Sequence, residues 1–217
     1  MLQRFVPYAA TYLPRLLGGL FPDLLWRREP EANERTLYLT FDDGPTAAMT
    51  DPILRLLDRF DARATCFLVG AQAEGDPERV RRIADAGHTV GNHTFTHPDP
   101  WRTSDETLIR ELERTTDVLQ SITGQPVRHL RPPYGRFTRA MRRWGRRRGQ
   151  RVVMWDVMPG DFLGMATQAS VKRHVLRFAR GGSVVVLHDN PIAPMTPAAL
   201  ETVLRHFSKR GWRFAGL

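Results

Sequence analysis

Cysteine is nearly absent from this chain, and lysine is scarce. Cys66 is the single cysteine among 217 residues, which excludes an intramolecular disulfide and a metal site built from several thiolates. It lies in an apolar run, where a cysteine packs as a small core residue. Lysine occurs only at 172 and 209, so the net charge of +9 comes almost entirely from arginine. This excess raises the question of an anionic partner, and a coding bias toward arginine is the alternative explanation.

Long apolar runs are also missing. No stretch reaches the ~18 uninterrupted apolar residues of a membrane-spanning helix. Residues 1–25 are apolar but interrupted by prolines, and they lack the charged start, unbroken apolar stretch and small-residue cleavage site of a secretory signal. We interpret residues 1–35 as an N-terminal leader segment and linker, packed on the domain or lying against a membrane surface. By default, this predicts a cytoplasmic or membrane-associated protein.

The chain from 36 to 217 alternates predicted strands and helices about seven times. Strands are predicted at 37–41, 64–69, 88–92, 129–130, 152–155, 183–187 and 212–214. The helices between them begin at capping residues such as Ser104 and end at glycines such as Gly149. Apolar strands without clean alternation suit a parallel sheet covered by helices. The sequence therefore predicts one α/β domain over 36–217, either an open doubly wound sheet or a closed (β/α) barrel.

Polar residues follow several of the predicted strands. They are Asp42, Asp43, His93, His97, Arg131, Asp161 and His188. A (β/α) barrel gathers the residues at the carboxyl ends of its strands on one rim. Their positions favour a barrel of about seven parallel strands with the helices outside.

Two adjacent carboxylates, Asp42 and Asp43, end the first predicted strand before Gly44 and Pro45 turn the chain. Neighbouring residues on a strand point to opposite faces, so one carboxylate can bind a metal while the other remains free as a base. The alternative is a polar loop in which one carboxylate caps the turn.

The pair His93 and His97 is the second candidate for metal binding. Four residues apart on a helix, the two imidazoles share one face, but Pro98 and β-branched neighbours make a tight loop an equal alternative. Two histidines and one carboxylate with open positions are typical of a catalytic metal site. Together with the two aspartates, the histidine pair more strongly indicates a metal site.

Four motifs stand in a characteristic order. They are Thr40-Phe41-Asp42-Asp43-Gly44-Pro45, His93-Thr94-Phe95-Thr96-His97, Arg131-Pro132-Pro133-Tyr134-Gly135 and Leu187-His188. With these motifs, residues 36–215 resemble the polysaccharide deacetylase family, the NodB-homology domain of carbohydrate esterase family four. The resemblance implies a distorted (β/α) barrel that removes N-acetyl, or sometimes O-acetyl, groups from sugars with the help of a metal.

The resemblance also implies a role for each matching residue of the reaction centre. Asp43, His93 and His97 would bind one divalent ion, zinc or a similar metal. Asp42 would act as the general base, with Arg131 as its partner.

The remaining matches concern the acid and the substrate. His188 would be the general acid, supported by Asp161, and Tyr134 would offer its backbone N–H to the oxyanion. Leu187 would line the acetyl pocket, and Pro133 completes the predicted substrate-binding set.

A further family motif lies between the third and the last of these and is called the fourth motif below. It is matched less well, over Trp155 to Phe162. The family tends to show Asp-x-x-Asp-Trp, whereas this chain has Met158 in place of the first aspartate and Phe162 in place of the tryptophan. The second aspartate is kept as Asp161. We expect the chemistry to persist and the substrate preference to change.

A stripe of arginines marks the predicted helix 138–148. Its members, at three- and four-residue spacing, are Arg139, Arg142, Arg143, Arg146 and Arg147. One interpretation is a patch for an anionic polymer or membrane surface, and the other is a solvated helix face.

The leading hypothesis is a metal-dependent deacetylase acting on an N-acetylated glycan or a lipid-linked sugar. A non-catalytic glycan-binding module on the same barrel is the alternative, but binding alone needs neither Asp42 nor His188. The chain lacks a helix-turn-helix, a zinc-finger pattern and interleaved basic and aromatic residues, so no nucleic-acid partner is predicted. Four other histidines are interpreted as surface or packing residues: His88, His129, His174 and His206.

Overall fold

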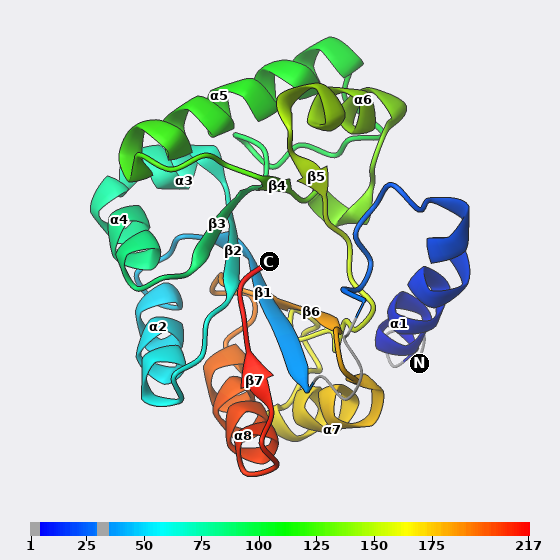
Figure 1. The fold of residues 1–217 in the computed structure, drawn as a ribbon, viewed down its shortest axis with the longest axis vertical. Helices are drawn as coiled ribbons and strands as arrows, with labels where there is room; N and C mark the ends of the chain where they lie inside the picture. Colours follow the sequence, from blue (N-terminus) through cyan, green and yellow to red (C-terminus); the bar gives the residue numbers. More distant parts are fainter. Residues whose placement is uncertain (1–4, 30–34) are drawn as a thin grey trace.

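The computed structural model describes residues 5–29 and 35–217, and its strands form a ring with helices on the outside (Figure 1). The strands are β1 (Thr36–Gly44), β2 (Thr65–Leu68), β3 (Thr89–Asn92), β4 (His129–Leu130), β5 (Arg151–Val152), β6 (Val184–His188) and β7 (Arg213–Phe214). They pair in the order β5-β4-β3-β2-β1-β6, with β7 beside β1, and all these pairs are parallel. The predicted α/β fold, a distorted barrel, is confirmed.

Eight α-helices surround these strands in the described residues. They are α1 (Val6–Leu17), α2 (Thr50–Arg59), α3 (Gly70–Gly75), α4 (Pro77–Asp85), α5 (Asp105–Thr123), α6 (Arg139–Arg148), α7 (Gln168–Phe178) and α8 (Thr196–Ser208). Ser104 caps α5 through its hydroxyl, and Gly149 ends α6 with φ of 67°, as their sequence positions predicted. Helices α1 and α3 were not predicted. Within the described part of the chain, no helix is long and apolar enough to cross a membrane.

Strand β1 lies between β2 and β6 in the barrel wall and is buried on both of its faces. Leu39 and Phe41 belong to the large core cluster that joins the sheet to the helices. Tyr38 belongs to a second cluster, with Phe67 and Val153. Because both faces are buried, the strand appears in the sequence as a continuous apolar run rather than an alternating one.

The barrel closes through a segment that precedes β1. Leu25 pairs with Val153 after β5, and Arg27 pairs with Ser183 before β6. Helix α1 packs beside α7, where the hydroxyl of Thr11 lies 2.9 Å from Nε2 of His174 (Figure 1). These contacts lie inside the predicted leader and linker, and the division of the chain at residue 35 stays a prediction.

Candidate active site

The carboxyl end of β1 carries a β-bulge that separates the two adjacent aspartates. Asp42 pairs with Phe67 of β2 and Gly44 with Leu68, so Asp43 is an extra residue without a partner in this ladder. Asp43 has φ of 73°, a left-handed conformation that is unusual for a residue with a Cβ. The bulge thereby sends the two carboxylates into different surroundings.

Asp43 lies against both predicted metal-binding histidines. Its Oδ1 is 3.3 Å from Nε2 of His93 and 3.2 Å from Nε2 of His97. Within the described residues, one donor atom from each of the three lies within 4.8 Å of the others. Burial acts to raise the pKa of Asp43, but hydrogen bonds from the two imidazoles outweigh it and hold that pKa below its ordinary value. The structure thus brings the predicted metal set together.

Neighbouring groups orient these donors as a metal site requires. The Nδ1–H of His93 donates to the carbonyl oxygen of Arg131 at 2.7 Å, so in the neutral ring the lone pair lies on Nε2, the atom that faces Asp43. The side-chain amide of Asn190 donates to the second oxygen of Asp43 at 2.5 Å. Two imidazoles and one carboxylate, with supports at His93 and Asp43, fit a divalent cation such as zinc with open positions for water and substrate.

The two histidines lie on a loop rather than a helix. Thr94 and His97 have φ of 64° and 58°, in the left-handed region that a right-handed helix excludes. The loop is held by the Glu111 carboxylate of α5, which accepts from the backbone N–H of Phe95 at 2.8 Å and of Thr96 at 2.6 Å. Of the two alternatives for this pair, the structure has the tight loop.

Arg131 binds Asp42 inside the barrel. Its side chain is 0% exposed, and Nη1 donates to Oδ1 of Asp42 at 2.7 Å and to the hydroxyl of Thr40 at 2.7 Å. The rest of the guanidinium donates to the carbonyl oxygens of Val153 and Met154. Burial lowers the pKa of Arg131, although Asp42 opposes that effect. Asp42 therefore has a fixed orientation and stands apart from the metal set.

His188 ends β6 and is held by Asp161. Its Nδ1–H donates to Oδ1 of Asp161 at 2.9 Å, and its backbone N–H donates to Oδ2 at 2.8 Å. The hydroxyl of Thr196 donates to the same Oδ2 at 2.6 Å. Burial acts to lower the pKa of His188, but the charge and hydrogen bond of Asp161 raise it to about 9. The imidazole is therefore protonated at neutral pH.

The three residues predicted to bind substrate are less closely grouped than the predicted metal-binding residues. Tyr134 is 63% exposed, and its ring centroid lies 4.8 Å from that of His97. Pro133 is buried in the turn before it. Leu187 is buried in the large core cluster on the helix side of the sheet. The roles of these three residues stay predictions.

Sequence reasoning missed the residues that support the site. Asn190 and Glu111 belong to no recognised motif, although Asn190 comes only two residues after His188. Asp189 is also buried, where it accepts a 2.6 Å hydrogen bond from the Thr50 hydroxyl, and burial raises its pKa to about 7. Its proximity in sequence to His188 was the one signal that pointed to it.

Met158 and Phe162, which depart from the fourth motif, both make contacts in the folded chain. The backbone N–H of Met158 donates to the hydroxyl of Thr11 in α1 at 3.2 Å. Phe162 packs edge-on against His188, with ring centroids 4.8 Å apart. The apolar wall beside His188 is thus formed by phenylalanine.

The arginine stripe of α6 is partly used within the molecule. Arg142 forms two hydrogen bonds to Asp23, at 2.9 and 2.6 Å, and lies over the ring of Phe21. Arg143, Arg146 and Arg147 are exposed. The anionic partner of this stripe stays a prediction.

The amino-acid sequence of this chain is similar to those of two deacetylases. A Bacillus cereus peptidoglycan-N-acetylglucosamine deacetylase is 32% identical over 187 residues, covering 85% of this chain and 68% of that protein. A chitooligosaccharide deacetylase from Rhizobium leguminosarum bv. trifolii is 37% identical over 162 residues, which is 74% of each chain.

Solved structures share the fold. A peptidoglycan N-acetylglucosamine deacetylase in complex with 4-naphthalen-1-yl-N-oxidanyl-benzamide superimposes with a TM-score of 0.84 at 29% identity, covering 90% of this chain and 91% of that one. A mutant pseudoenzyme of carbohydrate esterase family four, with restored enzymatic activity, gives 0.80 at 27% identity, covering 88% and 68%.

The polysaccharide deacetylase family model matches residues 29–153, which is more than half of the chain. Together with the relatives above, this match confirms what the four motifs predicted, and the chain belongs to the polysaccharide deacetylase family.

Proposed function

We propose that this chain hydrolyses the N-acetyl group of an amino sugar in a glycan or a lipid-linked sugar. The substrate class is supported by the relatives, which are named for peptidoglycan N-acetylglucosamine and for chitooligosaccharides. One observation carries the proposal: Asp43 contacts the two histidines, whereas the adjacent Asp42 contacts Arg131. Glycan binding alone requires no such division between a metal-binding carboxylate and a separate base.

The side chains divide the reaction between them. Asp43, His93 and His97 would hold a divalent metal, which would polarise the acetyl carbonyl and lower the pKa of water. Asp42, oriented by Arg131 at 2.7 Å, accepts a proton from the attacking water. Asp42 and Asp43 are adjacent in sequence, but Asp42 contacts Arg131 and Asp43 contacts the two histidines, so the base is separate from the metal-binding carboxylate.

The acid and the oxyanion donor complete the reaction. His188 carries the proton that its Asp161 contact stabilises, and it gives that proton to the departing amine nitrogen. The backbone N–H of Tyr134 donates to the developing oxyanion, a type of contact worth ~3 kcal/mol. Phe162 shields the His188 ring from solvent on one side.

The alternative is a protein that has kept the barrel and lost the reaction. Such proteins exist in this family, since one structural neighbour is described as a pseudoenzyme. In this chain Asp42 contacts Arg131 and His188 contacts Asp161, so both the proposed base and the proposed acid keep their partners. This supports an active enzyme.

The test compares Asp42→Asn with Asp43→Asn. Asp42→Asn should keep its metal while acetate release falls on the order of 10²–10⁴-fold, because only the base is removed. Asp43→Asn should lose metal, and excess zinc should restore part of its activity. Metal content and acetate release are measured on peptidoglycan fragments, chitooligosaccharides and a lipid-linked amino sugar, with and without a chelator.

Asp58→Asn, an exposed site on α2, is the matched control and should change neither quantity. Full activity in Asp42→Asn would exclude Asp42 as the base. Loss of metal from Asp42→Asn but not from Asp43→Asn would reverse the two roles.

A further inference from the structure

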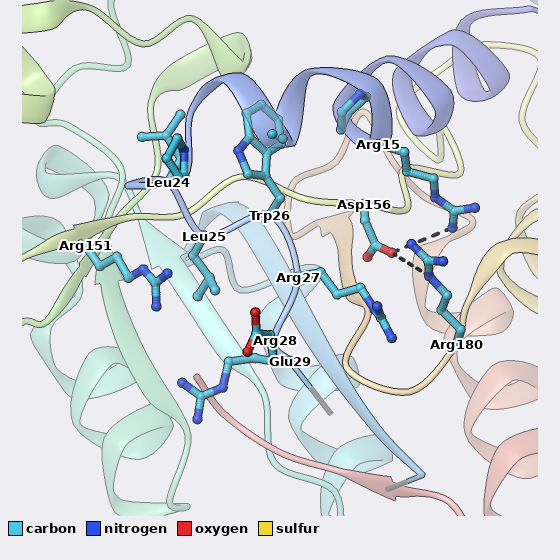
Figure 2. A pocket seen from close by; sticks show the side chains of 14 residues that line it. Arg15, Leu24, Leu25, Trp26, Arg27, Arg28, Glu29, Arg151, Asp156 and Arg180 are labelled. Atoms are coloured by element: carbon cyan, nitrogen blue, oxygen red, sulfur yellow. Dashed lines mark ion pairs between the residues drawn. The ribbon is translucent and has the colours of Figure 1, made fainter. Parts of the chain in front are cut away.

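A cavity of about 690 Å³ opens at the end of the barrel away from the candidate active site (Figure 2). Arg151, which begins β5, and Arg180, which precedes β6, line this cavity. His188 ends β6, so the two sites lie about 13 Å apart along that strand at 3.3 Å per residue. The cavity therefore takes no part in the chemistry proposed above.

Three guanidinium groups gather around one carboxylate on one side of the cavity (Figure 2). Nη2 of Arg15 lies 3.7 Å from Oδ2 of Asp156, and Nε of Arg180 lies 3.8 Å from the same oxygen. Arg27 lies beside them and donates to the carbonyl oxygen of Gly181 at 3.0 Å. Three positive charges against one negative charge leave an excess of two.

Both carboxylate oxygens of Asp156 accept hydrogen bonds from the start of β6. Its Oδ1 accepts from the backbone N–H of Val184 at 2.9 Å, and its Oδ2 accepts from the hydroxyl of Ser183 at 3.1 Å. Its side chain is almost completely buried. These hydrogen bonds fix the carboxylate at the start of β6, and its single negative charge balances only one of the three surrounding arginines.

Several donors of these arginines remain unused. Nε of Arg15 is buried without a partner in the described chain. The side chain of Arg180 is 53% exposed, and its one ion pair with a described residue is the long contact to Asp156. On the opposite wall, Arg151 makes no side-chain hydrogen bond or ion pair with the part of the chain that is described. Burial lowers the pKa of Arg27, and the charge of Arg180 lowers it further. A purely structural role would leave these donors unexplained.

The charge and shape of the cavity indicate the ligand. The whole lining holds five arginines and two carboxylates, an excess of three positive charges: Arg15, Arg27, Arg28, Arg151 and Arg180 against Glu29 and Asp156. A phosphate monoester carries about −1.5 to −2 at neutral pH with three acceptor oxygens, so it would balance most of this excess, whereas one carboxylate would balance only a third. The planar fork of arginine also suits phosphate oxygens. Next to the arginines, Pro22, Leu24 and Trp26 provide an apolar wall. We propose that this cavity binds a phosphate monoester whose organic part lies against that wall.

The phosphate group can belong to a soluble ester or to a lipid headgroup. Isothermal titration of the full chain in phosphate-free buffer would therefore use phenyl phosphate, inorganic phosphate and benzoate. Sedimentation with phosphatidylcholine vesicles, with and without phosphatidic acid, tests the lipid source. If the natural ligand is a soluble phosphate ester, phenyl phosphate should bind more tightly than inorganic phosphate and benzoate. Binding only to vesicles that contain phosphatidic acid would assign the site to a headgroup.

Arg180→Gln and Arg27→Gln should each weaken binding of the productive probe about tenfold, because each removes a charged hydrogen-bond donor. Arg55→Gln removes the same charge from an exposed position on α2 and should leave the affinity unchanged. Acetate release and the thermal midpoint serve as controls for folding. If Arg27→Gln fails to fold, Arg180→Gln carries the test, because its side chain is largely exposed.

The proposal is wrong if no phosphate probe binds at low ionic strength. It is also wrong if Arg180→Gln and Arg55→Gln reduce affinity equally, since that would indicate attraction by net charge alone. Because acetate release is measured separately, an inactive chain that still binds phosphate would overturn the deacetylase proposal and leave this one standing.

Discussion

His188 and Asp161 illustrate how one contact sets the protonation state of the proposed general acid. A buried imidazole would ordinarily lose its proton more easily, because burial disfavours the charged form. Here two hydrogen bonds join His188 to a single carboxylate, one from the ring and one from the backbone. The same carboxylate is held in place by Thr196, so the contact is rigid. The acid is therefore available at neutral pH.

A pH profile tests this arrangement. With the pKa of His188 at about 9, the acid is present below that pH and is lost as the pH rises through it. Asp161→Asn removes the partner that raises this pKa, so the high-pH limb of kcat should move to lower pH, toward the ordinary 6.5. The measurement is kcat for acetate release between pH 6 and 10. An unmoved limb in Asp161→Asn would mean that another group titrates, and Asp58→Asn should retain the original profile.

At the scale of elements, the candidate metal site depends on a loop whose backbone is held by a neighbouring helix. The loop 93–97 contains two left-handed residues other than glycine, Thr94 and His97, and such a backbone persists only when its surroundings impose it. Glu111 of α5 provides that constraint by accepting from two successive backbone N–H groups. The long helix α5 thus positions a histidine that it does not itself carry.

Glu111→Gln should weaken metal binding while the fold is retained. The amide cannot accept from both N–H groups with the strength of a carboxylate, so the loop should loosen and metal affinity should fall about 10–100-fold, as for other supporting residues of metal sites. Metal content after dialysis against graded chelator concentrations measures the change. Glu106→Gln changes an exposed carboxylate of the same helix and should have no effect. Equal affinities in the two variants would exclude the role given to Glu111.

At the scale of the whole molecule, the barrel is completed by a segment from the N-terminal side of β1. Leu25 and Arg27 lie between the ends of β5 and β6, which are otherwise joined only by the isolated bridge of Val157 to Val185 among the described residues. Helix α1, on the same segment, contacts both α7 and the loop of Met158. The segment therefore adds to the single bridge that closes the barrel at this point.

Leu25→Ala should lower the free energy of unfolding by about 2–5 kcal/mol, because the side chain is 3% exposed and its removal leaves a cavity. Leu16→Ala, at a position 76% exposed on α1, should change it by no more than about 0.5 kcal/mol. Urea unfolding followed by circular dichroism gives both values. A loss below 1 kcal/mol in Leu25→Ala would show that the barrel does not rely on this segment.

The sequence by itself predicted the seven strands and every α-helix of the described residues except α1 and α3, and it singled out the residues proposed for the reaction centre. Apolar runs, capping residues and glycines act over a few neighbouring positions, so Ser104 and Gly149 marked helix ends correctly. The four motifs were sufficient to identify the family, because each holds its chemical groups within six consecutive residues. Local signals left the pair at 93 and 97 undecided between helix and loop.

Only the tertiary structure decided how distant parts of the chain support these groups. Glu111, Asn190 and the closing residue Leu25 lie far in sequence from the groups they contact, and no local pattern marks such a contact. The bulge at Asp43 is set by the register between β1 and β2, which depends on the pairing of two strands. The arginine-lined cavity likewise exists because the start of the chain crosses the barrel beside β6, bringing together charges that stand over 150 residues apart in the sequence.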